Sequence, residues 1–177
     1  MEISRSYTPV SLFHSTTPLA PTSLHFLIKI YPDGALTPQL GELSPGSQVC
    51  VSDHTGSFSH TKLSSCQTIY FLSAGTGCTP IFSLLYKMSQ MKTQVSTKLL
   101  FFNKTQADII WQKQLADFQA CQPWLSVVHV LSEEGEEWEG DRGRVRKELL
   151  QQHFQEAKEG CFAAICGPKG FTAESNR

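Results

Sequence analysis

The sequence of 177 residues lacks the patterns that mark several large classes of enzyme. Its six cysteines include no Cys-x-x-Cys pair and its six histidines show no metal-ligand spacing, so we expect neither a disulfide framework nor a metal site. No Gly-x-Ser-x-Gly segment is present, which removes the nucleophile turn of many serine hydrolases. The cysteines are therefore predicted to be free thiols in a reducing compartment.

The chain also has almost no net charge and no long apolar run. A formal net charge of −1 argues against a nucleic-acid partner. No apolar run approaches the roughly 20 residues that span a membrane, and no signal-peptide hydrophobic region follows Met1. We therefore expect a cytoplasmic protein without a membrane span, and association with the endoplasmic reticulum stays open.

The pattern of apolar and turn-forming residues changes near residue 66. This change predicts two domains, 1–65 and 66–177. The first has short alternating runs with frequent Pro, Gly and Ser, which are typical of antiparallel β structure, and strands are expected at 25–31 and 47–52. The second alternates strand-like and helix-like segments, the pattern of a doubly wound parallel sheet. Its expected strands are 69–73, 98–102, 126–131 and 161–166, and its expected helices are 80–91, 108–121 and 144–156.

The turn Gly75-Thr76-Gly77 follows an apolar strand-like run and leads into a helix-like segment. Its glycines let the backbone approach an anion, and the first amides of the helix point toward the same place. Thr79 can cap that helix and Pro80 is favoured in its first turn. Because Pro80 replaces the third glycine of the usual dinucleotide fingerprint and no P-loop lysine follows, the segment by itself predicts either a nucleotide-phosphate site or a simple structural turn.

Two other clusters carry groups suited to a flat, charged cofactor. In the segment Arg5-Ser6-Tyr7-Thr8, an extended strand places Arg5 and Tyr7 on one face, so that a cation for phosphate lies beside an aromatic ring. The segment Cys166-Gly167-Pro168 ends a strand at the sheet edge where the glycine turn is also expected. Taken alone, the two clusters could equally be an edge strand and a buried cysteine before a turn.

Together with Gly34-Ala35-Leu36-Thr37, these clusters resemble, in order and spacing, the motif series of the ferredoxin-reductase-like flavoenzymes, and most closely the NADH-cytochrome b5 reductases. Segments 26–32 and 101–105 look like the members in which a haem domain is fused to the reductase. The resemblance covers nearly the whole chain. It implies a β plus α/β fold class: a partial antiparallel FAD-binding barrel followed by a nucleotide-binding domain, with the first barrel strands and the C-terminal end of the second domain missing.

The resemblance also implies which residues hold FAD. Arg5 would neutralise the pyrophosphate, Tyr7 would lie against the isoalloxazine ring, and the Thr8 hydroxyl would reach the flavin nitrogen that accepts hydride. The residues expected around the flavin and the FAD phosphates are Thr79, Gly34, Leu36 and Thr37.

For the pyridine nucleotide, the resemblance implies that Lys29 helps to hold the nucleotide and that the turn of Gly75, Thr76 and Gly77, followed by Pro80, cradles its pyrophosphate. Cys166, Gly167 and Pro168 would border the nicotinamide, which makes Thr8 and Cys166 the expected catalytic residues. The implied reaction passes electrons from NADH or NADPH through FAD to cytochrome b5 or to a fused cytochrome b5 haem domain. A truncated, non-catalytic nucleotide-binding remnant and a flavin reductase with another acceptor are the alternatives.

Overall fold

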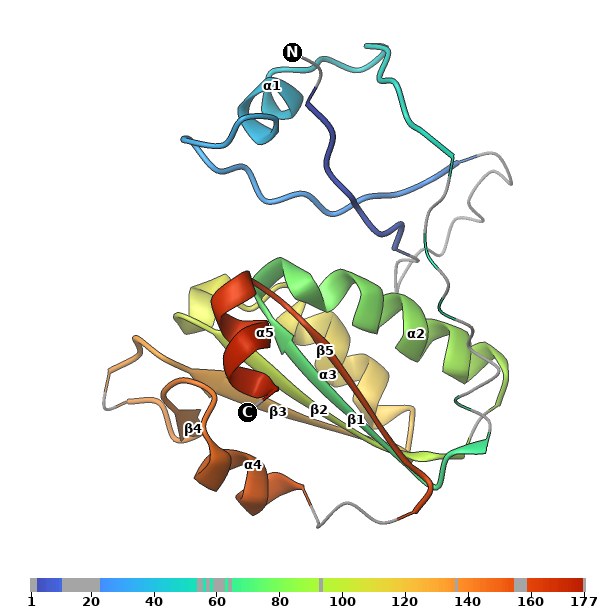
Figure 1. Cartoon of the computed structure of the whole chain (residues 1–177), viewed down its shortest axis with the longest axis vertical. Helices are drawn as coiled ribbons and strands as arrows, with labels where there is room; N and C mark the ends of the chain where they lie inside the picture. Colours follow the sequence, from blue (N-terminus) through green and yellow to red (C-terminus); the bar gives the residue numbers. More distant parts are fainter. Residues whose placement is uncertain are drawn as a thin grey trace.

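The structure is a computed structural model, and it falls into an N-terminal half of extended chain and a C-terminal α/β half (Figure 1). The described residues are 3–10, 23–53, 56, 58, 63, 65–92, 94–135, 137–154 and 159–176. Within these ranges no helix combines the length and the apolar character needed to cross a membrane.

Five parallel strands form one sheet in the order β4-β3-β2-β1-β5. The strands are β1 (Thr68–Ala74), β2 (Ser96–Asn103), β3 (Leu125–Leu131), β4 (Asp141–Arg142) and β5 (Cys161–Cys166). The four strands predicted for this half are confirmed, whereas the two-residue β4 was not predicted. Because β1 lies between β2 and β5, the strand order reverses beside it, and its carboxyl end is the usual ligand position in such a sheet.

Helices cover both faces of the sheet (Figure 1). They are α2 (Cys78–Gln90), α3 (Gln112–Ala120), α4 (Lys147–His153) and α5 (Lys169–Ser175), with 3-10 turns η2 (Gly75–Gly77) and η3 (Gln106–Asp108). Alternate residues of β1 and β2 point to opposite faces, so Phe71 and Phe101 pack with Phe82 of α2, while Leu72 and Leu100 pack beneath α4 and α5. Burial on both faces explains why these strands are continuous apolar runs.

The helix predicted at 108–121 is present as α3, which begins four residues later than predicted, at Gln112. Thr105 and Asp108 form a reciprocal capping box around η3, and Trp111 adopts a left-handed conformation with φ of 54°. A separate turn therefore precedes α3. The predicted start was wrong because the spacing of apolar residues along the chain does not reveal such a break. The helix predicted at 144–156 is present as the shorter α4, which ends where Phe154 becomes extended.

The predicted strands at 25–31 and 47–52 are wrong. Within the described residues 3–10 and 23–53, the pairing is one isolated antiparallel bridge between Pro9 and Phe26, and the regular element is the short helix α1 (Thr37–Gly41). An extended segment becomes a strand only where a neighbour pairs with its amides, and residues 47–53 are exposed with no ladder partner among the described residues. Backbone hydrogen bonds close turns at 32–34 and 44–46, where the Gly34 and Ser47 amides donate to the Tyr31 and Ser44 carbonyls.

Candidate functional site

A cleft of about 910 Å³ lies where the carboxyl ends of the sheet strands meet the N-terminal half. Lys29 and Tyr31 line it from the N-terminal half, and Gly75, Asn103 and Pro168 line it from the ends of β1, β2 and β5. The two halves also touch beside it, because the Ser83 hydroxyl of α2 donates to the Pro9 carbonyl at 2.6 Å. The cleft therefore occupies the position that the reversal of strand order predicts for a ligand.

The glycine turn forms one wall of this cleft. Gly75 has φ of +51°, a conformation that favours glycine, and a Cβ there would meet nothing within 4 Å. At Gly77 a Cβ would stand 2.3 Å from the Cys166 carbonyl oxygen, so the turn and the end of β5 are in direct contact. Thr79 donates its hydroxyl to the Thr76 carbonyl at 3.1 Å and fixes the turn to the start of α2.

The two cysteines at this contact are protonated thiols. Burial raises the pKa of the Cys78 thiol to about 12, and the nearby Cys166 adds to the shift. Burial likewise raises the pKa of Cys166, which ends β5. The next residue, Gly167, packs so closely that a Cβ would lie 2.7 Å from the Phe171 ring and 3.0 Å from Ala74. The structure thus brings the glycine turn and the segment Cys166–Pro168 together at one end of the sheet. Of these residues, Gly75, Thr76 and Pro168 line the cleft.

Lys29 and Asp108 form an ion pair across the mouth of the cleft. The Lys29 Nζ lies 3.4 Å from Asp108 Oδ1 and 5.9 Å from the centre of the Tyr31 ring. The hydrogen bond from Thr105 is the main reason that the pKa of Asp108 lies below its ordinary value, and Lys29 lowers it further. Exposed ion pairs are weak, so an anion in the cleft can compete with Asp108 for the ammonium group.

The residues predicted to hold FAD lie in the N-terminal half, except Thr79, which lies in α2. Arg5 is exposed and donates to the Ser4 carbonyl at 2.7 Å, while Tyr7 and Thr8 are half-buried. These three are not among the described residues that line the cleft.

The other FAD residues of this half, Gly34, Leu36 and Thr37, belong to the turn that leads into α1, whose first residue is Thr37. The Tyr31 amide donates to the Thr37 hydroxyl at 3.0 Å, and a Cβ on Gly34 would lie 2.6 Å from that oxygen. Leu36 is the N-cap residue of α1. The structure therefore gives Gly34 and Thr37 a role in closing this turn.

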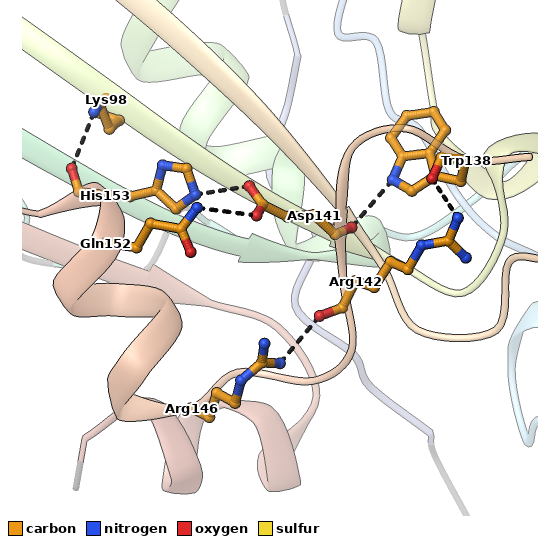
Figure 2. Close-up of polar contacts among 7 residues, drawn as sticks. All are labelled: Lys98, Trp138, Asp141, Arg142, Arg146, Gln152 and His153. Atoms are coloured by element: carbon orange, nitrogen blue, oxygen red, sulfur yellow. Dashed lines mark hydrogen bonds and ion pairs between the residues drawn. The ribbon is translucent and has the colours of Figure 1, made fainter. Parts of the chain in front are cut away.

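A polar network surrounds β4 (Figure 2), and the loop that follows β4 lines another part of the cleft with residues 143–145. His153 at the end of α4 binds Asp141 with 2.7 Å between Nε2 and Oδ2, and the Lys98 ammonium donates to the His153 carbonyl at 3.0 Å. Trp138 Nε1 donates to the Asp141 carbonyl at 3.1 Å, and Arg142 donates to the Trp138 carbonyl. These bonds join α4 to β4 and β2, and they hold Trp138, in the loop before β4, against that strand.

Sequence reasoning missed Asn103 as a site residue. It ends β2, lines the cleft and is only 8% exposed, yet neither its Oδ1 nor its Nδ2 has a hydrogen-bond partner. The available signal was a polar residue closing the apolar run Leu99–Phe102, on the strand beside the glycine turn. A buried amide without a partner is costly, so Asn103 indicates a polar ligand.

Known families and relatives match this arrangement. Residues 71–176 match the oxidoreductase NAD-binding domain family, and residues 1–60 match the oxidoreductase FAD-binding domain family. Cytochrome b5 reductase 4 from Mus musculus is 41% identical over 99% of this chain and 35% of its own length. The chain belongs to the cytochrome b5 reductase family. NADH-cytochrome b5 reductase 1 from Mortierella alpina is 33% identical over 94% of this chain and 54% of its own length.

A solved structure of the family has the same fold. The CS-b5R domains of human Ncb5or, in the NAD+ form, superpose with a TM-score of 0.88 at 36% identity, covering 100% of this chain and 52% of that chain. This confirms the predicted fold class, a ferredoxin-reductase-like fold with FAD-binding and NAD-binding parts. The chain spans about a third of the length of its cytochrome b5 reductase 4 relatives and about half of the solved chain.

Proposed function

We propose that this chain is the FAD- and NAD-binding part of an oxidoreductase that passes electrons from NADH or NADPH through FAD to cytochrome b5 or a fused cytochrome b5 haem domain. Residues 1–65 form its FAD-binding domain and residues 66–177 its NAD(P)-binding domain. The observation that carries the proposal is the direct contact between the Gly75–Gly77 turn and the end of β5 at the cleft. FAD, when bound, takes electrons in pairs from a nicotinamide and releases them singly to a haem.

The nucleotide half of the cleft fits a dinucleotide. The open, left-handed Gly75 leaves the turn accessible, and the 13-residue helix α2 directs its amides and the positive end of its dipole to the same place. Thr76 and Gly77 complete the phosphate cradle, with Pro80 in the first turn of α2. Lys29 supplies the cation on the opposite wall once it leaves Asp108.

The nicotinamide ring lies against Cys166, Gly167 and Pro168 in this proposal. Both Cys166 and Cys78 are neutral thiols at physiological pH because burial raises their pKa values. The segment therefore offers the ring a close, uncharged surface. Its work is to fix the angle of the ring rather than to move a proton.

The FAD site is formed by Arg5, Tyr7 and Thr8 together with the turn of Gly34, Leu36 and Thr37. Exposure leaves the Arg5 guanidinium accessible to a pyrophosphate, with which it can form a charge-assisted pair. The Thr8 hydroxyl would supply the hydrogen bond to the flavin, and Thr79, in the first turn of α2, would offer a second hydroxyl near the ring. The match of residues 1–60 to FAD-binding domains supports this assignment.

In this proposal the protein works in the cytoplasm. All six cysteines are free thiols, including the exposed Cys50 and Cys121. Free exposed thiols are typical of a reducing compartment, which supports the cytoplasmic assignment.

The deciding experiment reconstitutes the whole chain with FAD and adds NADH under argon. We expect a yellow flavin spectrum that NADH bleaches, followed by reduction of cytochrome b5. NADH binding without flavin uptake would identify a nucleotide-binding remnant instead. Bleaching with reduction of quinone or ferricyanide but not of cytochrome b5 would assign another acceptor.

Lys29→Met tests the nucleotide site within this reaction. We expect the KM for NADH to rise about tenfold with little change in kcat, since a phosphate contact stabilises the bound substrate and the transition state equally. Lys113→Met is the matched control, because Lys113 forms an ion pair at 2.6 Å with Asp117 on the exposed face of α3. Equal KM values for the two variants would remove Lys29 from the site.

A further inference from the structure

Asn103 stands at the centre of the cleft's sheet edge. The last aligned pair of β1 and β2 is Ala74 with Phe102, so the next step along both strands brings Asn103 opposite Gly75. On its other side Asn103 aligns with Leu131, the last residue of β3. It is therefore the residue of β2 that lies nearest in register to the glycine turn.

The fold gives the Asn103 amide no hydrogen-bond partner. Its backbone carbonyl accepts a hydrogen bond from the Ser132 amide at 3.1 Å, but its Oδ1 and Nδ2 are buried without a partner. Leu99 and Phe101, which precede it on the same face of β2, are fully buried in the apolar core. An apolar residue would continue this pattern, and burying an unpaired amide instead lowers stability.

The charges beside Asn103 limit what its ligand can be. Lys104 and Glu133 flank it on the cleft wall and form an ion pair with 3.0 Å between Nζ and Oε1. The pair leaves no net charge for a phosphate. An amide offers one donor group and one acceptor, whereas a phosphate only accepts, so a phosphate would leave Oδ1 unpaired. A ribose hydroxyl both donates and accepts and satisfies the amide.

We propose that the Asn103 side-chain amide binds a ribose hydroxyl of the pyridine dinucleotide, next to the phosphates held by the Gly75–Gly77 turn. The proposal rests on the proposed function, since it names a further binding residue in the same cleft. The shared chemistry is a ribose diol, which either the adenosine or the nicotinamide end can supply. The unpaired Asn103 amide thus lowers the stability of the free protein, and it raises the affinity for the dinucleotide.

The test measures the dissociation constant by calorimetry for the full chain with ADP-ribose, with ADP and with nicotinamide mononucleotide. For Asn103→Leu we expect about tenfold weaker binding of ADP-ribose, the effect of losing one buried hydrogen-bonded contact. The fragment that shows the same loss, ADP or the mononucleotide, identifies the ribose. In the absence of ligand the Tm of this variant should rise, because the unpaired amide is gone.

Ser73→Ala is the matched control. The Ser73 hydroxyl is also buried and unpaired, at the end of β1 on the same face, but Ser73 is not among the described residues that line the cleft. We expect its dissociation constants to equal those of the wild type. Asn103→Asp keeps the shape of the side chain and should also weaken binding at least tenfold, which secures the test if the leucine variant does not fold.

Two outcomes would overturn the assignment. One is wild-type affinity for ADP-ribose in both Asn103 variants. The other is a lowered Tm for Asn103→Leu with unchanged affinity, which would make the amide part of the fold. If the wild-type chain itself binds none of the three probes, the proposed function fails before Asn103 is tested.

Discussion

The two halves of this chain differ in how far the fold covers their apolar side chains. In the α/β half, side chains such as Phe71, Phe82 and Leu100 are completely buried between sheet and helices. In the N-terminal half, Leu24 and Val51 are 67% and 68% exposed. A β-like pattern becomes a strand only when other parts of the chain cover both its amides and its apolar side.

The difference divides the work between the halves. Burial of apolar area is the main stabilising contribution to folding, and it is concentrated in the α/β half. The N-terminal half contributes Lys29 and Tyr31 to the cleft and contacts the other half through bonds such as Ser83 to Pro9. The α/β half therefore sets the stability, and the N-terminal half completes the site.

A pair of identical substitutions gives the largest expected contrast. Leu100→Ala removes a fully buried side chain from β2 and should lower the free energy of unfolding by about 2–5 kcal/mol. Leu24→Ala removes an exposed side chain and should change it by less than about 0.5 kcal/mol. Urea unfolding followed by circular dichroism measures both. Similar losses would show that the N-terminal half is packed as tightly as the sheet.

Glycine substitutions give a smaller contrast. Gly77→Ala would place a methyl group 2.3 Å from the Cys166 carbonyl oxygen and should cost about 1–3 kcal/mol, since backbone atoms must separate. It should also weaken NADH binding, because the turn and the end of β5 move apart. Gly46→Ala, in the N-terminal half, meets nothing within 4 Å and costs only the strain of its φ of +93°, about 1 kcal/mol.

Thermal unfolding and calorimetric NADH titration separate the two glycine variants. Gly46→Ala should keep wild-type NADH affinity. If Gly77→Ala also keeps it, the contact between the turn and β5 is not part of the nucleotide site.

The sequence predicted the α/β half well because its signals are local. Apolar runs long enough for a buried strand, each followed by a turn, identified four of the five strands, and the parallel topology then placed Gly75 and Cys166 at one edge. The strands expected at 25–31 and 47–52 failed because pairing depends on distant segments. Alternation along the chain does not say whether a partner exists.

Asn103 shows the same limit inside the site. Its residue type is visible in the sequence, but its lack of a partner depends on everything that surrounds it in space. The ion pair of Lys29 with Asp108, 79 positions apart, was equally invisible. Sequence motifs reveal segments that bind a ligand through their backbone more readily than they reveal single polar side chains that bind it.

His129 gives the smallest expected effect and tests how well the packed half excludes water. It lies in β3, its Nδ1 is buried without a partner, and its ring lies 5.8 Å from that of Phe101. Burial lowers the pKa of His129 below its ordinary value of 6.5. As the pH falls through about 6.5, the imidazole takes up a proton in the unfolded chain, whereas in the folded protein it does so only at a lower pH. Between these two pKa values the unfolded chain therefore binds more protons than the folded protein. The Tm should therefore be constant above about pH 7.5 and fall as the pH drops below 6.5. His129→Gln should have a flatter Tm profile over this range, and parallel profiles for the two proteins would mean that water reaches this part of the sheet.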